Sequence, residues 1–253
     1  MEQWRDQAIV LAARSHGENG AVLSVLSEHN GRHAGYVRGA KSSKMRGILE
    51  RGNLVNVDWQ ARTTSDLGTF NVEPIGHPAA TILDDPLRLA GLVAACRICD
   101  ESLPEREGHT GLFHGMQAML QALETENWAV IYVMWEVALL KELGFSLDLQ
   151  NCAGGGDNSD LAYVSPKTGK AVSRAEGEPY KDRLLPLPDF LNHSVDGGGS
   201  NEDILKGLEL TGYFFQHWVF AHHTRGIPED RLRFQERFAK TVGTVNNVEA
   251  DTA

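Results

Sequence analysis

The sequence has few cysteines and no long uninterrupted apolar run, and each shortage excludes a class of protein. Three cysteines among 253 residues cannot form the disulfide framework of a small secreted domain. The longest apolar run, residues 128–140, is interrupted by Glu136 and is too short to span a bilayer. The N-terminal MEQWRDQAIVLAAR lacks the basic segment that precedes the apolar core of a secretory signal. We therefore expect a reduced, cytoplasmic protein that does not bind membranes.

Recognisable catalytic motifs are also missing. The chain contains no H-E-x-x-H, G-x-S-x-G, Walker A or G-x-G-x-x-G pattern, and its histidines are scattered. Cys96 and Cys99 have the spacing of half a zinc site or of a redox pair. They lie in an apolar helical pattern, however, where cysteine is an ordinary buried residue, and Cys152 stands alone. The sequence thus predicts binding rather than catalysis, with no metal and no cofactor.

Positive charge is scarce overall but concentrated in one place. The chain has 24 Lys and Arg against 34 Asp and Glu, a net charge of −10. Residues 1–80 hold nine basic and eight acidic residues, whereas residues 81–253 hold 15 and 26. Residues 32–51, RHAGYVRGAKSSKMRGILER, carry six basic residues and one acidic residue. This basic segment predicts a local site for a polyanion such as nucleic acid, unless it is an ordinary solvated loop.

Residues 6–77 have the pattern of five short β-strands. Asn19-Gly20 and His29-Asn30-Gly31 mark tight turns, and NLVNVDWQAR alternates apolar and polar residues. Five strands with a longer charged connection predict a small closed barrel such as the OB-fold over residues 1–78, which binds single-stranded nucleic acid. The expected DNA-binding residues are Arg32, Arg38, Lys41, Lys44, Arg46 and Arg51, with Tyr36 as a candidate for base stacking. Lys41, Lys44 and Arg46 come first because residues 39–47 are the most loop-like, and we expect Trp59 and Phe70 to be core residues.

Residues 79–253 have mainly helical patterns, so the predicted fold class is α+β. Asp84-Asp85-Pro86 is a helix start, and residues 127–144 are apolar on nearly every side and should form a buried helix. Residues 146–190 are rich in loops and have two short β-like runs, LAYVS and KAVSR. Two further helices are expected from Asn201, as N-cap, and from Pro228 to Lys240, with a frayed tail after Thr241.

Several phrases resemble the RecO family of bacterial DNA repair proteins over roughly residues 5–240. They are LGTFNVEP at the fifth strand, LLKELGFSLDLQNC before the loop-rich region, LAYVSPKTGKAVSR within it and LLPLPDFL after it. The resemblance is strongest to alphaproteobacterial members. It implies an N-terminal OB-fold, a helical body over residues 79–253, and a zinc-finger-like region within residues 146–190. Of the four cysteines that many members use to bind zinc, only Cys152 is present here, so this region is expected to be a degenerate, zinc-free version held by packing of Tyr163, Val172 and LLPLP.

The resemblance also implies a function in DNA repair and recombination. RecO proteins bind single- and double-stranded DNA, anneal complementary strands and have no ATPase activity. With RecR, they help to load RecA onto DNA coated by single-strand-binding protein, whose acidic C-terminal tail they contact. This implies a cytoplasmic, nucleoid-associated protein whose basic segment matches the family's DNA-binding region. Arg88, Arg97 and Lys141 are candidates for contacting the acidic tail, or else ordinary solvated helix charges.

Two other readings of the residues remain open. The acidic region from residue 81 onward would also suit a protein-interaction scaffold that does not bind DNA directly. A zinc or redox enzyme that uses Cys96 and Cys99 would bind stoichiometric metal or expose a reactive thiol.

Overall fold

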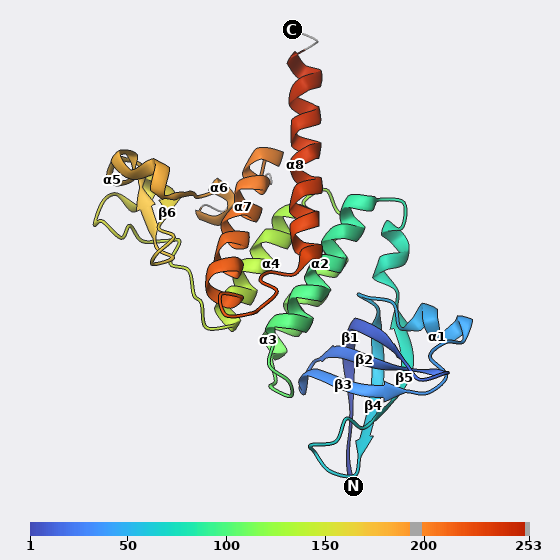
Figure 1. Cartoon of the computed structure of the whole chain (residues 1–253). Helices are drawn as coiled ribbons and strands as arrows, with labels where there is room; N and C mark the ends of the chain where they lie inside the picture. The colour runs from blue at the N-terminus through green and yellow to red at the C-terminus, as the bar shows by residue number, and fades with distance from the viewer. Residues whose placement is uncertain (193–198, 251–253) are drawn as a thin grey trace. The chain divides into compact units, whose positions relative to one another are not determined.

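A computed structural model of the chain describes residues 1–192 and 199–250, with side chains described to residue 243 (Figure 1). The chain divides into two compact units, Met1–Glu124 and Thr125–Ala253. An N-terminal five-stranded sheet is followed by helices, so the predicted α+β class is confirmed. Within the described ranges, every helix is too short or too polar to cross a membrane.

The sheet of the first unit closes on itself as a barrel. Its strands are β1 (Glu2–His16), β2 (Gly20–Ser27), β3 (Gly31–Val37), β4 (Leu54–Ala61) and β5 (Thr69–Gly76). They follow the order β1-β2-β3-β5-β4, and the long strand β1 pairs with both β2 and β4. All neighbours are antiparallel except β3 and β5, which meet in parallel at Tyr36 and Thr69.

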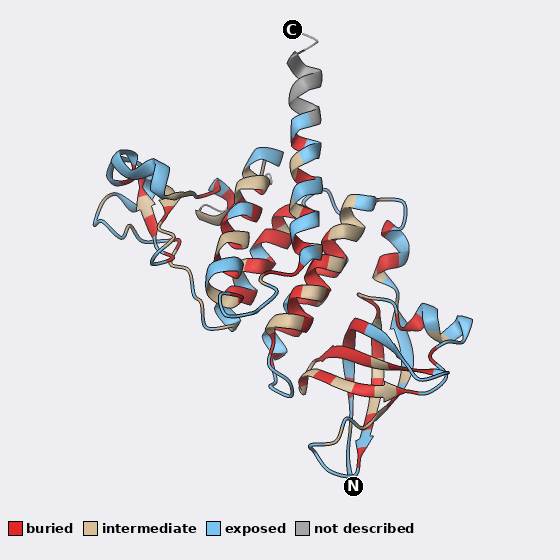
Figure 2. Ribbon diagram, viewed as in Figure 1, coloured by how far each residue is buried: buried red, intermediate tan, exposed pale blue. Residues whose placement is uncertain are grey.

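Alternation of buried and less buried residues sets the register of the barrel. Along β3 and most of β4, every second residue is buried, as expected for strands with one face in the core (Figure 2). Trp59 and Phe70 are each only 3% exposed, which confirms their predicted core role. Trp4 stacks on Trp59 with ring centroids 5.8 Å apart. Apolar and aromatic side chains therefore fill the barrel.

The two predicted tight turns exist, but the first differs in detail. In the turn between β2 and β3, Gly31 has φ +64°, and an added Cβ would lie 1.7 Å from the carbonyl oxygen of Glu107. Only glycine fits both requirements. In the turn between β1 and β2, positive φ falls on Gly17 and not on Asn19-Gly20, the pair that signalled the turn. Gly20 instead begins β2.

A short helix replaces the loop expected in the basic segment. Residues Ser43–Ile48 form α1, and the side chain of Ser42 accepts a hydrogen bond from the backbone N–H of Met45 (3.3 Å). Ile48 and Leu49 are buried in the barrel core, and Met45 packs against it. An N-cap at the start and apolar anchors at the end stabilise one helical turn and a half. The prediction that residues 39–47 are loop-like was therefore wrong for most of their length.

Two long helices complete the first unit. They are α2 (Pro86–Ser102) and α3 (Thr110–Ala122), preceded by the 3-10 helix η1 (Pro78–Ile82). The predicted start of α2 is confirmed, because Asp85 caps it by accepting from the N–H groups of Leu87 and Arg88. Both helices pack on β1 and β2 and belong to the compact unit Met1–Glu124. Sheet and helices share one core there.

Cys96 and Cys99 belong to this shared core. Both are fully buried in α2, and the thiol of Cys96 points at the carbonyl oxygen of Val10 in β1 (3.7 Å). Burial raises the pKa of Cys96 to about 12 and raises that of Cys99 as well. The thiols therefore stay protonated and unreactive, as expected for packing residues.

The second unit consists of helices and a small sheet. Its main helices are α4 (Trp128–Glu142), α7 (Asn201–Phe214), the π-helical turn η4 (Phe215–Val219) and α8 (Glu229–Ala250). Nine of the fifteen residues of α4 are buried, which confirms the predicted central helix. The N-cap of α7 is Ser200, one residue before the predicted Asn201. Helix α8 continues to Ala250, well past the expected end at Lys240.

The loop-rich region of the second unit forms a three-stranded sheet in the order β7-β6-β8. Its elements are η2 (Asn158–Asp160), β6 (Leu161–Val164), β7 (Ala171–Ser173), α5 (Arg174–Gly177), η3 (Glu178–Arg183), β8 (Leu185–Pro186) and α6 (Asp189–Asn192). Leu161, Val164 and Ala171 are buried, whereas the predicted anchors Tyr163 and Val172 are only half-buried. Val172 alternates with the buried Ala171 and Ser173 of β7, whereas in β6 the register shifts between Leu161 and Tyr163.

A buried ion pair joins three helices of the second unit. Arg231 of α8 and Glu136 of α4 are both fully buried, and the arginine Nη2 donates to the glutamate Oε2 at 2.9 Å. Arg231 also donates to the carbonyl oxygen of Leu208 in α7 (2.8 Å), and the hydroxyl of Thr211 donates to Glu136. Each buried charge is thus satisfied, which is the condition for such a pair to be tolerated in a core.

A buried histidine lies inside the barrel. His33 is 3% exposed, and its ring meets those of Trp4 and Trp59 edge to face at 5.0 and 4.8 Å. Its ring nitrogens have no hydrogen-bond partner among the described residues. Burial, and then the positive charges of Arg106 and Arg32, lower the pKa of His33 to about 4. The imidazole is therefore neutral at pH 7.

Replacement of Glu136 tests the buried ion pair. Glu136→Gln leaves the guanidinium of Arg231 uncompensated in the core, so we expect the free energy of unfolding to fall by about 3 kcal/mol or more. Urea unfolding followed by circular dichroism measures the change. Asp203→Asn, which breaks the partly exposed pair with Lys206, is the control and should cost less than about 1 kcal/mol. Equal effects of the two substitutions would contradict this account.

Replacement of His33 tests the buried imidazole. Because its pKa is lower in the folded chain, the unfolded chain binds a proton first, and stability falls as the pH drops from about 6.5 towards 4. In His33→Phe the unfolding free energy should fall by about 2–3 kcal/mol less than in the wild type over this pH range, because no imidazole has to be kept neutral. His222→Gln, at an exposed position, should follow the wild-type curve. Parallel curves for His33→Phe and the wild type would refute the assignment.

Candidate nucleic-acid interface

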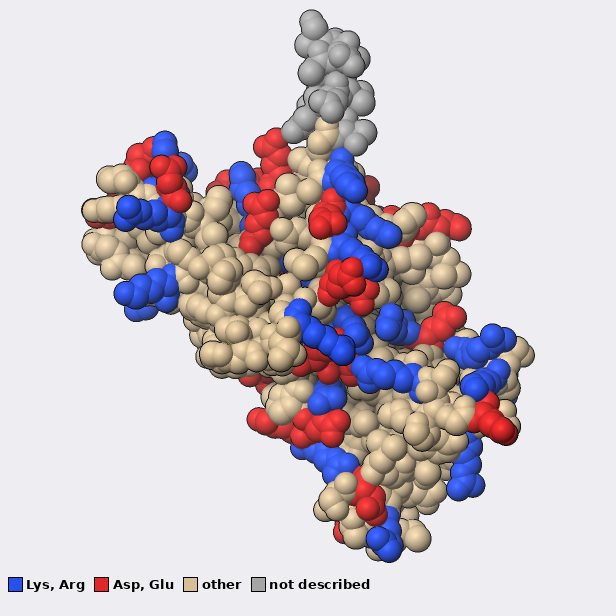
Figure 3. Space-filling model, viewed as in Figure 1, with Lys and Arg blue, Asp and Glu red and all other residues tan. Residues whose placement is uncertain are grey.

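The basic segment, residues 32–51, runs from β3 through α1 towards β4. Because the apolar residues of α1 face the barrel core, its polar residues face outward. Lys and Arg side chains gather over this end of the first unit (Figure 3). The surroundings of the predicted residues divide them into groups.

Three cationic side chains of the segment have no partner among the described residues. Arg38, Lys44 and Arg46 are exposed, and none of their side chains makes a hydrogen bond or ion pair in the described part of the chain. Other arginines of the barrel differ, since Arg5 pairs with Asp58 and Arg14 pairs with Asp100. An unpaired exposed cation keeps its full charge for an external anion. These three residues are therefore the best placed of the set to bind phosphate.

Lys41 has a backbone partner. Its Nζ donates to the carbonyl oxygen of Gly17, in the turn between β1 and β2, at 3.0 Å. This bond joins the turn to the segment that leads into α1. An ammonium group has three donors, so two remain for a ligand.

Arg32 and Arg51 differ from the rest of the set. Arg32 donates to the carbonyl oxygen of Leu103 at 2.7 Å and pairs with Glu105 at 3.4 Å, and its side chain is only 18% exposed. It thus fastens β3 to the segment between α2 and α3. Arg51 is half-buried, and its charge acts on the buried thiol of Cys96. Their surroundings favour a structural role for both.

Tyr36 lies on β3, half-buried beside the turn between β1 and β2. Its ring meets His16 edge to face at 6.0 Å. A Cβ added to Gly20 would lie 2.0 Å from its hydroxyl oxygen, so the tyrosine tip fits closely against that glycine. This position suits support of the turn better than an open platform for a base.

A small cavity accompanies the cations and was not foreseen from the sequence. Its volume is about 140 Å³, and it lies between the β1–β2 turn and α1. Lys41 and Arg46 line it together with small residues such as Ser15 and Ala40. The small residues on both arms of the hairpin were a signal in the sequence, but only closure of the barrel brings them beside α1.

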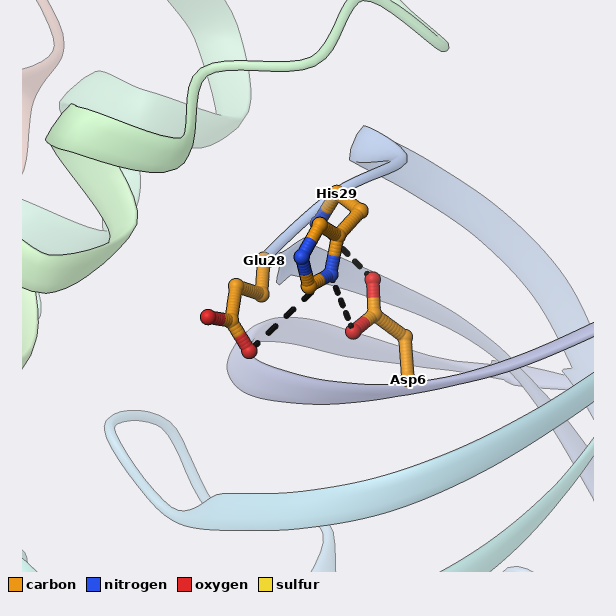
Figure 4. A group of neighbouring side chains, drawn as sticks. All are labelled: Asp6, Glu28 and His29. Carbon is orange, nitrogen blue, oxygen red and sulfur yellow. Dashed lines mark hydrogen bonds and ion pairs between the residues drawn. The ribbon is translucent and has the colours of Figure 1, made fainter.

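One group of side chains in the first unit could in principle hold a metal ion. Asp6, Glu28 and His29 place ligand atoms within 4.8 Å of one another, and both carboxylates face the imidazole (Figure 4). His29 Nδ1 lies 3.0 Å from Asp6 Oδ1 and 4.0 Å from Glu28 Oε2. A second histidine, His114, lies 3.2 Å from Glu28.

Hydrogen bonds already account for this group. Burial alone would raise the pKa of Asp6, but bonds from Ser27, His29 and Asn30 outweigh it and hold that pKa below its ordinary value. The hydrogen bond to Asp6 in turn raises the pKa of His29. The hydrogen bonds between the His29 residue and Asp6 hold the turn between β2 and β3 in place, and a metal would have to replace them. We therefore interpret the group as a clamp on the turn.

The remaining cysteine, Cys152, belongs to no group of three or more potential metal ligands among the described residues. Cys152 is half-buried, and its sulfur accepts a hydrogen bond from the backbone N–H of Ser173 at 3.2 Å. Although its burial opposes the charge, the hydrogen bonds from Ser173 and from the N–H groups of Gly154 and Gly156 lower its pKa. Hydrogen bonds account for the described contacts of this thiol.

The candidates for an acidic peptide tail also differ in their surroundings. Arg88 pairs with Asp85 at 2.9 Å, and Arg97 pairs with Glu101 at 2.8 Å within α2. Lys141 is exposed in the last turn of α4. The two arginines thus have local partners, as expected for ordinary helix charges.

Comparison with known proteins assigns the family. The model of the recombination protein O N-terminal family matches residues 1–77, and that of the C-terminal family matches residues 83–225. A DNA repair protein RecO of Rhodospirillum centenum is 50% identical over 240 residues, which cover 94% of this chain and 95% of the relative. The RecO protein of Caulobacter vibrioides is 46% identical over 239 residues, covering 94% and 98%. That of Cereibacter sphaeroides is 43% identical over 241 residues, covering 95% and 100%.

The resemblance read from the sequence is thereby confirmed along nearly the whole chain. The junction between the two family matches, residues 78–82, coincides with η1, which links the barrel to α2. The chain belongs to the RecO family of DNA repair proteins.

Proposed function

We propose that the protein is a non-catalytic recombination mediator that binds DNA through the outer face of its basic segment. In this proposal it binds single- and double-stranded DNA, anneals complementary strands and, with RecR, helps to load RecA onto DNA coated by single-strand-binding protein. The observation that carries the proposal is the group of unpaired cations Arg38, Lys44 and Arg46. Family membership supports the role in DNA repair.

The arrangement of the barrel supports nucleic-acid binding. The strand order β1-β2-β3-β5-β4, with a helix between β3 and β4, suits an OB-fold, a fold that commonly binds oligonucleotides. We propose that residues 1–78 serve as the DNA-binding domain and residues 79–253 as the helical domain. The net negative charge of the second part would keep DNA on the barrel side, because like charges repel.

The ion pairs of the barrel explain why binding would be local. Arg5 and Arg14 are neutralised by carboxylates within 3.4 Å, and Arg32 is similarly engaged. Phosphates therefore gain most at the segment from Arg38 to Arg46, where acidic partners are lacking among the described residues. Each phosphate neutralised there releases counterions, which supplies affinity without sequence preference.

We propose that the second unit supplies contacts with proteins. Among the candidates for the acidic tail of single-strand-binding protein, Lys141 is better available than Arg88 and Arg97, which have local ion pairs. Exposed apolar residues on the same unit, such as Met134 at 51% and Leu232 at 42%, also suit a protein partner. The zinc-finger-like region, residues 146–190, would act as a packed module without metal.

A scaffold that binds only proteins is the alternative function. The exposed apolar residues of the second unit would serve it equally well. The scaffold differs from the DNA-binding mediator in one respect, because it does not require unpaired cations on the barrel. Binding of DNA by the purified protein therefore separates the two functions.

Removal of the cations tests DNA binding. Lys41→Gln, Lys44→Gln and Arg46→Gln together should flatten the plot of log affinity against log salt by about 1–2 units, since each phosphate contact with a single strand contributes about 0.7. Fluorescence anisotropy of a labelled oligonucleotide over a range of NaCl concentrations measures this slope. The control is the combination of Lys167→Gln, Lys170→Gln and Arg183→Gln, which removes three exposed cations from the second unit. An unchanged slope in the first variant would refute the site, and no binding by the wild type would favour the scaffold.

Strand annealing tests the partner. The protein should anneal complementary strands coated by single-strand-binding protein, and deletion of that protein's C-terminal tail should slow the reaction while leaving annealing of naked strands unchanged. A fluorescence-quenching assay with both forms of the coating protein measures the two rates. Equal rates on the two coated substrates would remove the tail from the mechanism.

A further inference from the structure

We propose that the cavity between the β1–β2 turn and α1 binds a single phosphate group of a DNA strand. Lys41 and Arg46 would supply the charge, and Ser15 would supply a hydroxyl donor. This inference rests on the proposed DNA-binding function and makes it specific, since it assigns one phosphate to one built site.

The charge of the lining favours an anion. Lys41 and Arg46 line the cavity, and none of its lining residues is acidic. Two larger cavities of the same unit differ, because one combines Arg5 with Asp58 and the other combines Lys44 with Glu50. A carboxylate at the wall repels phosphate and competes for the cation. The cavity beside the β1–β2 turn is thus the best suited of these three to a phosphate.

The donors of the lining are available. Lys41 spends one of its three donors on the carbonyl oxygen of Gly17, and Arg46 has five donors without a partner among the described residues. The bond to Gly17 also limits where the ammonium group can lie, so less side-chain freedom is lost when a ligand binds. A guanidinium group can bind two phosphate oxygens at once, which makes Arg46 the principal contact.

The size of the cavity limits the ligand. Its volume of about 140 Å³ lies below the range of roughly 300–1,000 Å³ found for pockets that enclose drug-sized molecules. A phosphate fits this space, whereas a base with its sugar would have to remain outside. Contact with the backbone alone carries no sequence information, which agrees with a protein that must act on any DNA.

Small residues in the wall leave the cavity open. Ser15 and Ala40 contribute short side chains to its wall. Position 20 must be glycine, because the nearby hydroxyl of Tyr36 leaves no room for a side chain there. Larger residues on these walls would fill the space without altering its charge. The role of Tyr36 is therefore to support the turn that forms one wall.

A variant that fills the cavity tests the inference apart from charge. Ser15→Leu leaves every cation in place but occupies the phosphate position. We expect the plot of log affinity for a labelled oligo(dT) against log salt to be shallower by about 0.7 units than in the wild type, which is the effect of losing one phosphate contact. If the variant and the wild type bind equally at 1 M NaCl, the variant should then bind about fivefold more weakly at 0.1 M NaCl. Lys41→Gln with Arg46→Gln should weaken binding in the same way. Fluorescence anisotropy with the full chain measures both.

Controls separate this inference from the proposed function. Arg62→Gln with Lys167→Gln removes two exposed cations elsewhere and should keep the wild-type slope. Ala13→Leu, at a second exposed position of the wall, repeats the filling test if Ser15→Leu fails to fold by circular dichroism. If the filling variants bind as the wild type does while Lys41→Gln with Arg46→Gln weakens binding, the cations act diffusely and the phosphate site is wrong, although DNA binding stands. If the wild type binds no DNA, both proposals fail.

Discussion

The packing of α1 into the end of the barrel is the constraint on which the candidate interface depends. Ile48 and Leu49 are buried with the barrel's apolar side chains, and Met45 packs against them. A helix six residues long is not stable alone in water, so this burial and the Ser42 cap hold it together. Since one face of α1 must point into the core, Lys44 and Arg46 on its remaining surface must point outward. The direction of the cations is therefore a consequence of apolar packing.

The first unit is fixed more firmly than a five-stranded barrel alone would be. The clamp formed by Asp6, His29 and neighbouring polar groups holds the turn between β2 and β3, and Arg32 fastens β3 to the segment after α2. Gly31 approaches the backbone of Glu107 so closely that no side chain would fit between them. At this end of the barrel, charged side chains such as Asp6 and Arg32 stabilise the fold, whereas the cations beside α1 have no acidic partner among the described residues and can bind a ligand. The same residue types serve different purposes because their partners differ.

The second unit illustrates how a polar residue in an apolar run can be read. Glu136 interrupts the longest apolar stretch of the sequence, and its partner Arg231 lies 95 residues further along. Neither residue alone reveals the pair, because the spacing is set by the folding of α8 against α4. A fully satisfied ion pair of this kind favours one arrangement of the helices, since any slip would leave a charge buried without its partner.

The sequence by itself determined the class of fold, the order of strands and helices, and the place where positive charge gathers. Those properties follow from local periodicity, turn residues such as Gly31, and composition. Tertiary structure decided the surroundings of each member of the basic segment. Closure of the barrel placed Arg32 against Glu105 and formed the small cavity beside Lys41, whereas the side chains of Arg38, Lys44 and Arg46 have no partner among the described residues. It also turned an expected loop into α1, because the apolar side chains that stabilise that helix find their partners only in the assembled barrel. Contacts between residues far apart in the chain leave no local pattern, and for that reason the sequence could indicate the segment but not its individual roles.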